Sequence, residues 1–207
     1  MPVSAIDQTA ALIIFDQQKL NRYEMGHYLP AGTEWTEPLD DVIDRTARLA
    51  DAFRAFGWHV IYVTVPNALG IKVLKSGKTL GGRKTGGYVM TPGTPDDFDD
   101  IVPELTPQPD DLVIVKPMWD PFIGTSLEFD LRQLGVTQLF LTGLVTSIGV
   151  ESTARSGWNY GYNMVFVTDA MTDFDKDASD HTIDKIFPRL GENATTQEVL
   201  KSIGDTA

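Results

Sequence analysis

The sequence predicts an α/β fold in which parallel strands are covered by helices on both faces. Short apolar runs alternate with amphipathic stretches along most of the 207 residues. The runs are continuously apolar, which is typical of strands buried on both faces, as in a parallel sheet. Strand–helix–strand alternation implies right-handed crossovers, and these place helices on both sides of the sheet. Since neither an internal repeat nor a linker divides the chain, we expect one domain over residues 1–207.

Five apolar runs predict the strands. Each run ends at a charged residue, a proline or a glycine, which marks the point where the strand gives way to a loop. Asp16, Lys116 and Asp169 directly follow three of the runs. The predicted strands cover residues 11–15, 59–65, 111–115, 138–142 and 163–168.

Helical spacing of apolar residues appears between these runs. The clearest case is the segment 39–56, which Gly57 can end. Two further segments end at Gly135 and Gly161, and Thr125 or Ser126 is suited to cap the first of them. The predicted helices cover residues 39–56, 126–134, 148–160 and 196–203.

The composition argues against several classes of partner. A formal net charge of −12 repels nucleic-acid phosphates and anionic lipid surfaces. No apolar run approaches the roughly 18 residues of a membrane helix, and no secretory signal is visible, so we expect a cytoplasmic protein with a small-molecule substrate. The chain contains no cysteine, which leaves no disulfide, thiolate metal site or thiol nucleophile.

Polar residues at the strand ends form the first candidate site. In an open parallel sheet, ligands bind beyond the carboxyl ends of the strands. Asp16 and Lys116 lie at two such ends, and residues 143–149 follow a third. A carboxylate and an ammonium in a half-buried cleft shift each other's protonation, which favours an acid–base role. Taken alone, Asp16 is also consistent with a loop carboxylate or a helix cap, and Lys116 with a solvated lysine at a strand end.

The segment 144–151 is the second candidate. Its small residues lead from a strand into a helix, so backbone N–H groups and the helix dipole can face a ligand or a developing oxyanion. Thr146, Ser147 and Val150 lie in this turn and are candidate substrate-binding residues. The alternative is a plain helix start that Ser147 caps.

These segments together resemble the isochorismatase-like hydrolases. The resemblance rests on the acid-bearing strand end, the lysine strand end, the nucleophile turn and three later pieces, in the order 15–18, 116–127, 141–154, 161–162, 167–173 and 186–191. It implies a single-domain, three-layer α/β/α architecture with a six-stranded, mainly parallel, Rossmann-like sheet. It also implies homo-oligomers, dimers or larger, and a cis peptide bond in the turn, expected at Val145–Thr146.

One departure from the family pattern concerns the nucleophile. Amidase members use an Asp–Lys–Cys triad, and Gly149 stands at the position of their cysteine. We therefore expect no covalent thiol chemistry. Metal-binding members carry histidines soon after the second strand, whereas His27, His59 and His181 are scattered along this chain. The resemblance thus implies neither a metal nor another cofactor here.

Glycine at this position also resembles the true isochorismatases, which cleave a vinyl ether without a covalent intermediate. Carried over to this chain, Asp16 is the acid that protonates the enol carbon, and Lys116 is its electrostatic partner. Gly149 provides room for the substrate.

The remaining candidate residues concern the pocket. Arg83, in the long loop 67–109, could bind a substrate carboxylate through two hydrogen bonds, but an exposed arginine in a Gly-rich loop is the favoured interpretation. Trp119, Phe122 and Tyr23 are candidate pocket walls or simply core residues. Three functions stay open: a non-thiol hydrolase of this kind, a hydrolase that uses Asp16 with a hydroxyl of Thr146 or Ser147, and a catalytically silent member that binds a small molecule or an assembly partner.

Overall fold

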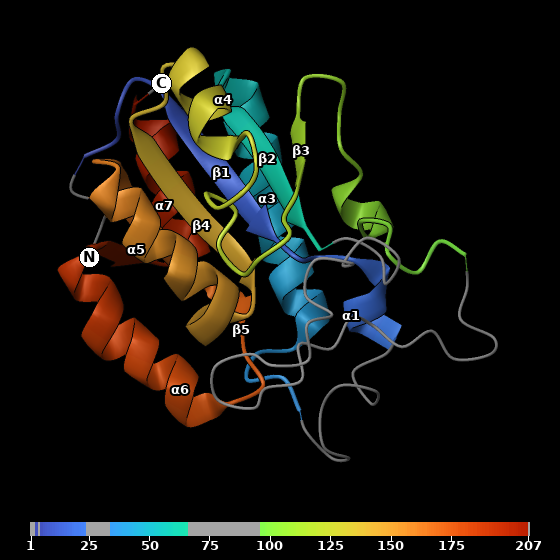
Figure 1. Ribbon diagram of the computed structural model, residues 1–207. Coiled ribbons are helices and arrows are strands. Elements are labelled where there is room, and N and C mark those ends of the chain that lie inside the picture. The colour runs from blue at the N-terminus through green and yellow to red at the C-terminus, as the bar shows by residue number, and fades with distance from the viewer. Residues whose placement is uncertain (1–2, 4, 24–33, 66–95, 207) are drawn as a thin grey trace.

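Six parallel strands form the centre of the molecule, and helices cover both faces of the sheet (Figure 1). The computed structural model describes residues 3, 5–23, 34–65 and 96–206. The strand order is β3-β2-β1-β4-β5-β6, and every neighbouring pair is parallel. The predicted three-layer α/β/α fold is thereby confirmed. The strands are β1 (Ala10–Phe15), β2 (His59–Thr64), β3 (Leu112–Val115), β4 (Gln138–Leu144), β5 (Asn163–Thr172) and β6 (Gly191–Ala194).

The helices agree with the sequence periodicity where an apolar stripe was present. The predicted segment 39–56 has the bounds of α3, and Gly57 caps it in the left-handed conformation. The segment predicted from residue 148 instead divides into a π-helical turn (Thr146–Val150) and α5. None of the described helices is both long and apolar enough to cross a membrane. The α-helices are α1 (Lys19–Tyr23), α3 (Leu39–Phe56), α4 (Leu127–Gln133), α5 (Glu151–Asn159), α6 (Lys176–His181) and α7 (Thr196–Thr206).

Among the described strands and α-helices, three escaped the sequence analysis because they lack an apolar stripe or run. β6 reads Gly-Glu-Asn-Ala, and α1 and α6 are short and mostly polar. The predicted end of the fifth strand at Thr168 was wrong, since β5 continues to Thr172. Asp169 lies inside this strand because its carboxylate accepts hydrogen bonds from the backbone N–H and the hydroxyl of Thr196.

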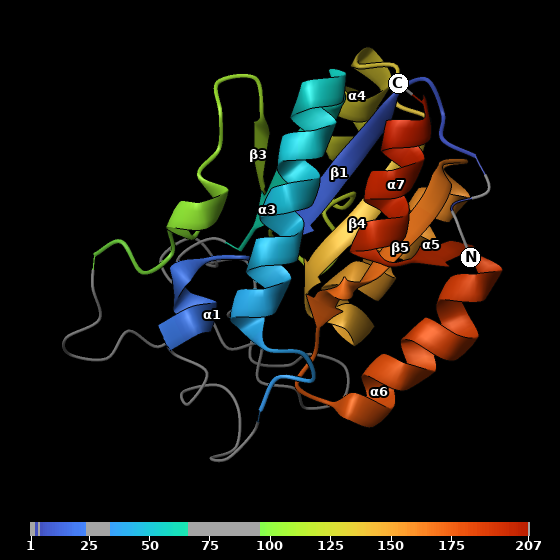
Figure 2. The ribbon, with the colours of Figure 1, turned by 180° about the vertical axis from the view of Figure 1, so that it is seen from behind.

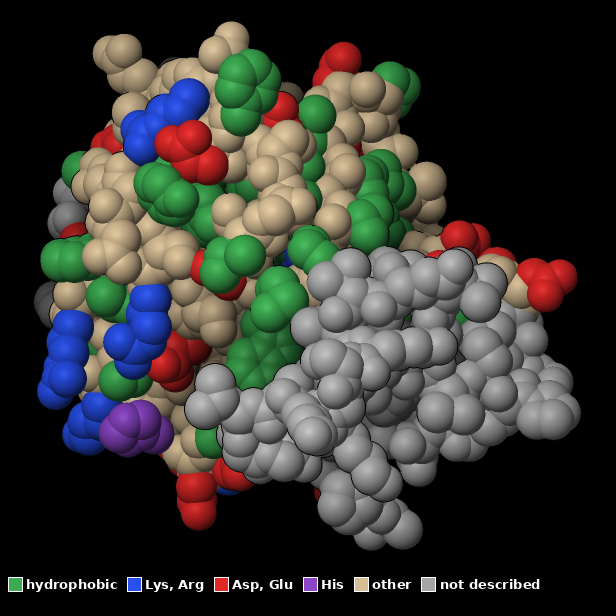
Figure 3. Space-filling model, viewed as in Figure 1, with side chains coloured by type: hydrophobic (Ala, Val, Ile, Leu, Met, Phe, Trp, Pro, Cys, Tyr) green, Lys and Arg blue, Asp and Glu red, His purple; other side chains and the backbone are tan. Residues whose placement is uncertain are grey.

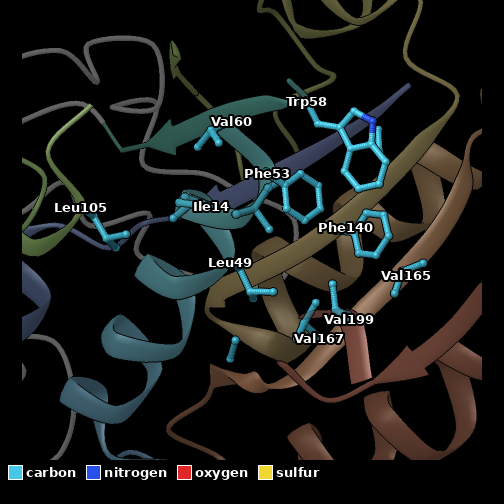
Figure 4. Close-up of a cluster of buried hydrophobic side chains, with 14 of the residues drawn as sticks. Ile14, Leu49, Phe53, Trp58, Val60, Leu105, Phe140, Val165, Val167 and Val199 are labelled. Atoms are coloured by element: carbon cyan, nitrogen blue, oxygen red, sulfur yellow. The ribbon is translucent and has the colours of Figure 1, made fainter. Parts of the chain in front are cut away.

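Alternate side chains of each strand divide the core into two layers. In β1, Leu12 and Ile14 face the side covered by α3 and α7, which Figure 2 shows in front. There Phe53 packs edge-on against Phe140 at 5.1 Å between ring centroids, with Trp58 beside it (Figure 4). Ala11, Ile13 and Phe15 face the layer that contains α4 and α5. Because both faces are buried, the strands are continuously apolar.

The strand order places a topological switch point beside β1. The chain runs from β1 outward to β2 and β3, and then returns to the opposite side of β1 as β4. In open α/β sheets a crevice forms outside the carboxyl ends of strands at such a point. The ends of β1 and β4 are therefore the expected location of the site.

Close approach of β1 and β4 at this end requires glycine at position 143. Gly143 pairs in register with Phe15 and has φ +105. A Cβ atom there would lie 2.2 Å from the carbonyl oxygen of Phe15, which is shorter than any contact between non-bonded atoms of this kind. Only a residue without a side chain permits this backbone geometry.

We predict that Gly143→Ala lowers the free energy of unfolding by about 3 kcal/mol or more, because it adds an overpacking clash to an unfavourable φ. Gly57→Ala is the matched control: it has φ +80 but nothing within 4 Å of the added Cβ, so only the backbone cost of about 1–2 kcal/mol applies. Denaturant unfolding of both variants measures the difference, and equal losses would contradict the prediction.

Candidate active site at the carboxyl ends of the strands

Asp16 and Lys116 form a buried ion pair at this end of the sheet. Asp16 directly follows β1 and Lys116 directly follows β3, and each backbone N–H donates to a carbonyl of β2, at Val63 and Thr64 respectively. The Lys116 Nζ atom lies 2.6 Å from Asp16 Oδ2. Their side chains are only 3% and 13% exposed. The lysine side chain thus spans the end of β2, which separates the two strands.

Burial and the neighbouring lysine act on the pKa of Asp16 in opposite directions. Desolvation raises the pKa of Asp16 above its usual value, although the charge of Lys116 and its hydrogen bond oppose the rise. Asp16 Oδ1 is buried and has no hydrogen-bond partner. Asp16 also has φ +51, an uncommon conformation for a residue other than glycine. A carboxyl group that is held in this way is suited to carry a proton at higher pH than an exposed aspartate.

The turn after β4 lies against this pair. Gly149 is buried within the π-helical turn, and a Cβ atom at this position would lie 3.2 Å from Lys116 Nζ. It would also lie 3.5 Å from the carbonyl oxygen of Trp119. A larger side chain at position 149 would therefore lie beside the ion pair. Glycine leaves this space free of side-chain atoms.

The cis peptide bond lies one residue earlier than expected. It joins Leu144 to Val145, where β4 ends and the turn begins, so the prediction of Val145–Thr146 was wrong in its position. The expected position rests on the resemblance of the turn to the family motif. That resemblance does not determine the residue at which β4 ends.

Asp173 supports the turn from the end of β5, and the sequence analysis did not single it out. One carboxylate oxygen accepts from the N–H of Ser147 at 2.7 Å. The other accepts from the N–H groups of Phe174 and Asp175 at 2.8 and 3.0 Å. The side chain is fully buried. Its place at the end of the segment 167–173, which resembles the family pattern, is the sequence signal that could have identified it.

Several N–H groups of the turn are consequently occupied. Ser147 donates to Asp173, while Ile148 and Val150 donate to the carbonyl of Val145. The predicted use of these donors for a ligand or an oxyanion does not apply to the three groups, because intramolecular acceptors satisfy them.

The loop after Lys116 is fastened to α5. Asp120 is buried, and its carboxylate accepts from the N–H of Phe122 and from the hydroxyl of Ser156. This anchor holds the backbone of Trp119 next to Gly149. The Trp119 side chain is 53% exposed.

The other candidate binding residues lie in different surroundings. Thr146 is buried, and its hydroxyl donates to the carbonyl of Thr172. Val150 and Phe122 belong to the buried cluster on the α4–α5 side, where Phe122 packs against aromatic rings of residues 160 and 162. Tyr23 ends α1, but its side chain lies outside the described part of the chain, as does the whole of Arg83.

Gln18 joins the two ends of the long loop near this site. Its amide nitrogen donates to the carbonyls of Val65 and Asp99, and its amide oxygen accepts from the N–H of Val65. Residues 66–95 lie outside the described residues. Gln18 therefore positions the chain on both sides of that segment, two residues after Asp16.

The opposite end of the sheet also contains a cavity. It measures about 450 Å³, and Gln138, Asn163 and Gly191 line it at the starts of β4, β5 and β6. We place the site at the carboxyl ends instead, because the switch point and the buried ion pair both lie there. Across residues 3, 5–23, 34–65 and 96–206, no group of three or more histidine or carboxylate side chains is arranged to hold a metal ion.

Comparisons with known proteins agree on one family. The family model described as the isochorismatase domain matches residues 10–198. The isochorismatase family protein YwoC of Bacillus subtilis is 34% identical, with 95% of each chain covered. The ureidoacrylate amidohydrolase RutB of Yersinia enterocolitica is 31% identical over 90% of this chain and 86% of its own. The solved structure of an isochorismatase family protein from Burkholderia thailandensis superposes with a TM-score of 0.77 at 33% identity, covering 98% of both chains.

We predict that Asp173→Ala destabilises the fold by about 3 kcal/mol or more, because it leaves three backbone N–H groups without their acceptor. Asp175→Ala is the control, since that exposed side chain accepts from the N–H of Ala178 at the start of α6, and loss of such a cap costs about 1 kcal/mol. Chemical denaturation followed by circular dichroism compares the two. Similar losses would show that Asp173 does not support the turn.

Proposed function

The chain belongs to the isochorismatase family of hydrolases, and we propose that it hydrolyses a small carboxylated or cyclic molecule without a thiol nucleophile. The observation that carries this proposal is the buried contact of 2.6 Å between Lys116 and Asp16, directly beside Gly149. This contact brings together the carboxyl group of Asp16, the cation of Lys116 and the backbone of Gly149, which has no side-chain atoms. The chain contains no cysteine that could act as nucleophile instead.

In the proposed reaction Asp16 is the general acid. Its raised pKa favours a protonated carboxyl group that donates its proton to the enol carbon of a vinyl ether. Water then attacks the oxocarbenium carbon and loses a proton, and the hemiketal collapses to a carbonyl compound and an alcohol. Lys116 stabilises the Asp16 carboxylate formed after proton transfer, which then recovers its proton from the attacking water.

The substrate class follows from the relatives and from the site. Isochorismate and ureidoacrylate are both carboxylates, and cleavage of a C–O or C–N bond is consistent with an acid beside a cation. We propose that Trp119, Thr146, Ser147 and Arg83 take part in substrate binding. Tyr23, Phe122 and Val150 complete the proposed set, the last two through packing behind the site.

Two other functions compete with this one. A hydroxyl-assisted hydrolase would need Thr146 or Ser147 as nucleophile or water holder, but the hydroxyl of Thr146 already donates to Thr172. A catalytically silent binding protein would keep the fold and the ion pair without turnover. An activity screen on isochorismate, small amides and carboxylated ethers separates the silent protein from the enzymes.

We predict that Asp16→Asn lowers turnover in this screen by about 100-fold or more, as expected for the loss of a general acid. Asp111→Asn is the matched control, because Asp111 is a buried carboxylate bound to Arg54 at the amino end of β3. That variant should lose stability and keep its turnover per folded molecule. Equal activity of Asp16→Asn and the wild type would remove Asp16 from the mechanism.

We also predict that kcat/KM falls as pH rises. Only the protonated form of Asp16 donates, and its folded pKa lies above the usual 3.8. The rate should be constant below the folded pKa and fall about tenfold per pH unit above it. The logarithm of kcat/KM plotted against pH tests this. An increase of the rate through the same acidic range would assign Asp16 the role of a base instead.

A further inference from the structure

Asp16 leaves β1 through an uncommon backbone conformation. Its N–H donates to the carbonyl of Val63 at 2.9 Å, as the N–H of a strand residue would. Its φ is +51, whereas residues of parallel strands have φ of about −120°. Rotation about the N–Cα bond decides where Cβ lies relative to the strand, so this φ sets the direction of the Asp16 side chain. Because the left-handed region is sparsely populated by residues other than glycine, contacts with the rest of the chain must hold Asp16 in it.

The direction of the Asp16 carboxylate depends on this backbone conformation. Among the described residues, Lys116 is the one hydrogen-bond donor to the carboxylate, through Oδ2, and Oδ1 has no partner. No second donor in that part of the chain therefore fixes the orientation of the carboxyl group. Hydrogen bonds weaken steeply when the geometry departs from linearity, so a rotation of the Asp16 backbone would weaken the contact with Lys116.

Two donors hold the peptide group that follows Asp16. Its carbonyl oxygen accepts a hydrogen bond from the N–H of Gln18 at 2.9 Å and a second one from the side-chain amide of Asn21. The preceding peptide group is held by Val63. Since peptide groups are planar, fixing the two groups on either side of a Cα atom defines φ and ψ of that residue. The Asn21 amide is the side-chain contribution to this arrangement.

The helix that carries Asn21 is anchored by its other residues. α1 has only five residues, so its position depends on tertiary contacts rather than on helix propensity. Leu20 is buried, and the guanidinium of Arg22 pairs with Asp40 of α3 and with Glu104. Figure 2 shows α1 beside α3. The Asn21 amide therefore reaches the Asp16 carbonyl from an element that is fastened to the rest of the molecule.

We propose that Asn21 is a positioning residue of the site: its amide holds Asp16 in the left-handed conformation and thereby keeps the Asp16 carboxylate on Lys116. The effect on turnover rests on the proposed function, whereas the effect on the ion pair does not require a substrate. A purely structural Asn21 would stabilise α1 and leave the contact between Asp16 and Lys116 unaffected. These two roles predict different results.

Nuclear magnetic resonance titration of the Asp16 carboxyl carbon tests the proposal without a substrate. Lys116 lowers the pKa of Asp16, so Lys116→Met should raise it, and the size of this rise measures the contact between the two side chains. In an Asn21→Ala background the rise should shrink by about half or more, because the interaction between the charges falls with their separation. Asn21→Asp keeps the size of the side chain and removes the donor. It should give the same result, and it replaces Asn21→Ala if that variant does not fold.

Asn159→Ala is the matched control. The Asn159 amide also donates to a backbone carbonyl, that of Arg155, but it does so at the exposed end of α5, on the side of the molecule that Figure 3 shows. In this background the rise caused by Lys116→Met should be as large as in the wild type. A rise of full size in both Asn21 variants as well would overturn the proposal.

Kinetics provide the second readout, on a substrate found in the activity screen. Asn21→Ala should lower kcat about tenfold or more and leave KM unchanged, because a misplaced reacting group slows the chemical step and not binding. Asn159→Ala should change neither constant. An Asn21→Ala variant that loses stability but keeps its kcat per folded molecule would also contradict the positioning role. An inactive wild type that shows the expected pKa responses would instead contradict the proposed reaction and leave the role of Asn21 supported.

Discussion

The buried ion pair between Asp16 and Lys116 is the interaction on which the site depends. Removing a carboxylate and an ammonium from water is costly, and the cost is offset only when the two charges meet in good geometry. The sheet provides this geometry because β1 and β3 are parallel and end at the same edge, with only β2 between them. The same burial that strengthens the pair raises the pKa of Asp16, so structure and proposed acid chemistry have one physical origin.

A second constraint acts where β4 approaches β1. Gly143 permits the contact with Phe15, and the chain then turns so that Gly149 comes to lie beside Lys116. The turn keeps its shape because the Asp173 carboxylate accepts hydrogen bonds from three backbone N–H groups that would otherwise have no acceptor. A buried carboxylate from β5 thus holds the part of the site that β4 supplies, which makes the centre of the sheet one connected unit.

The loop after Lys116 connects the site to the surface. Asp120 fastens this loop to α5 through Ser156, and the backbone of Trp119 contacts the position of Gly149. In the same loop, the side chains of Met118, Trp119 and Ile123 are 42–55% exposed. One segment therefore both contacts the site through its backbone and reaches the surface through its side chains.

The sequence alone determined the fold class, the strand ends that carry Asp16 and Lys116, and the absence of a thiol, because these depend on local periodicity and composition. It could not reveal β6 or α6, whose stability comes from packing rather than from an apolar pattern. The distance within the ion pair, the acceptor role of Asp173, the position of the cis bond and the burial of Val150 were decided by tertiary structure. Each of these features depends on which strands are neighbours in the sheet. Contacts between residues far apart in the chain decide that order.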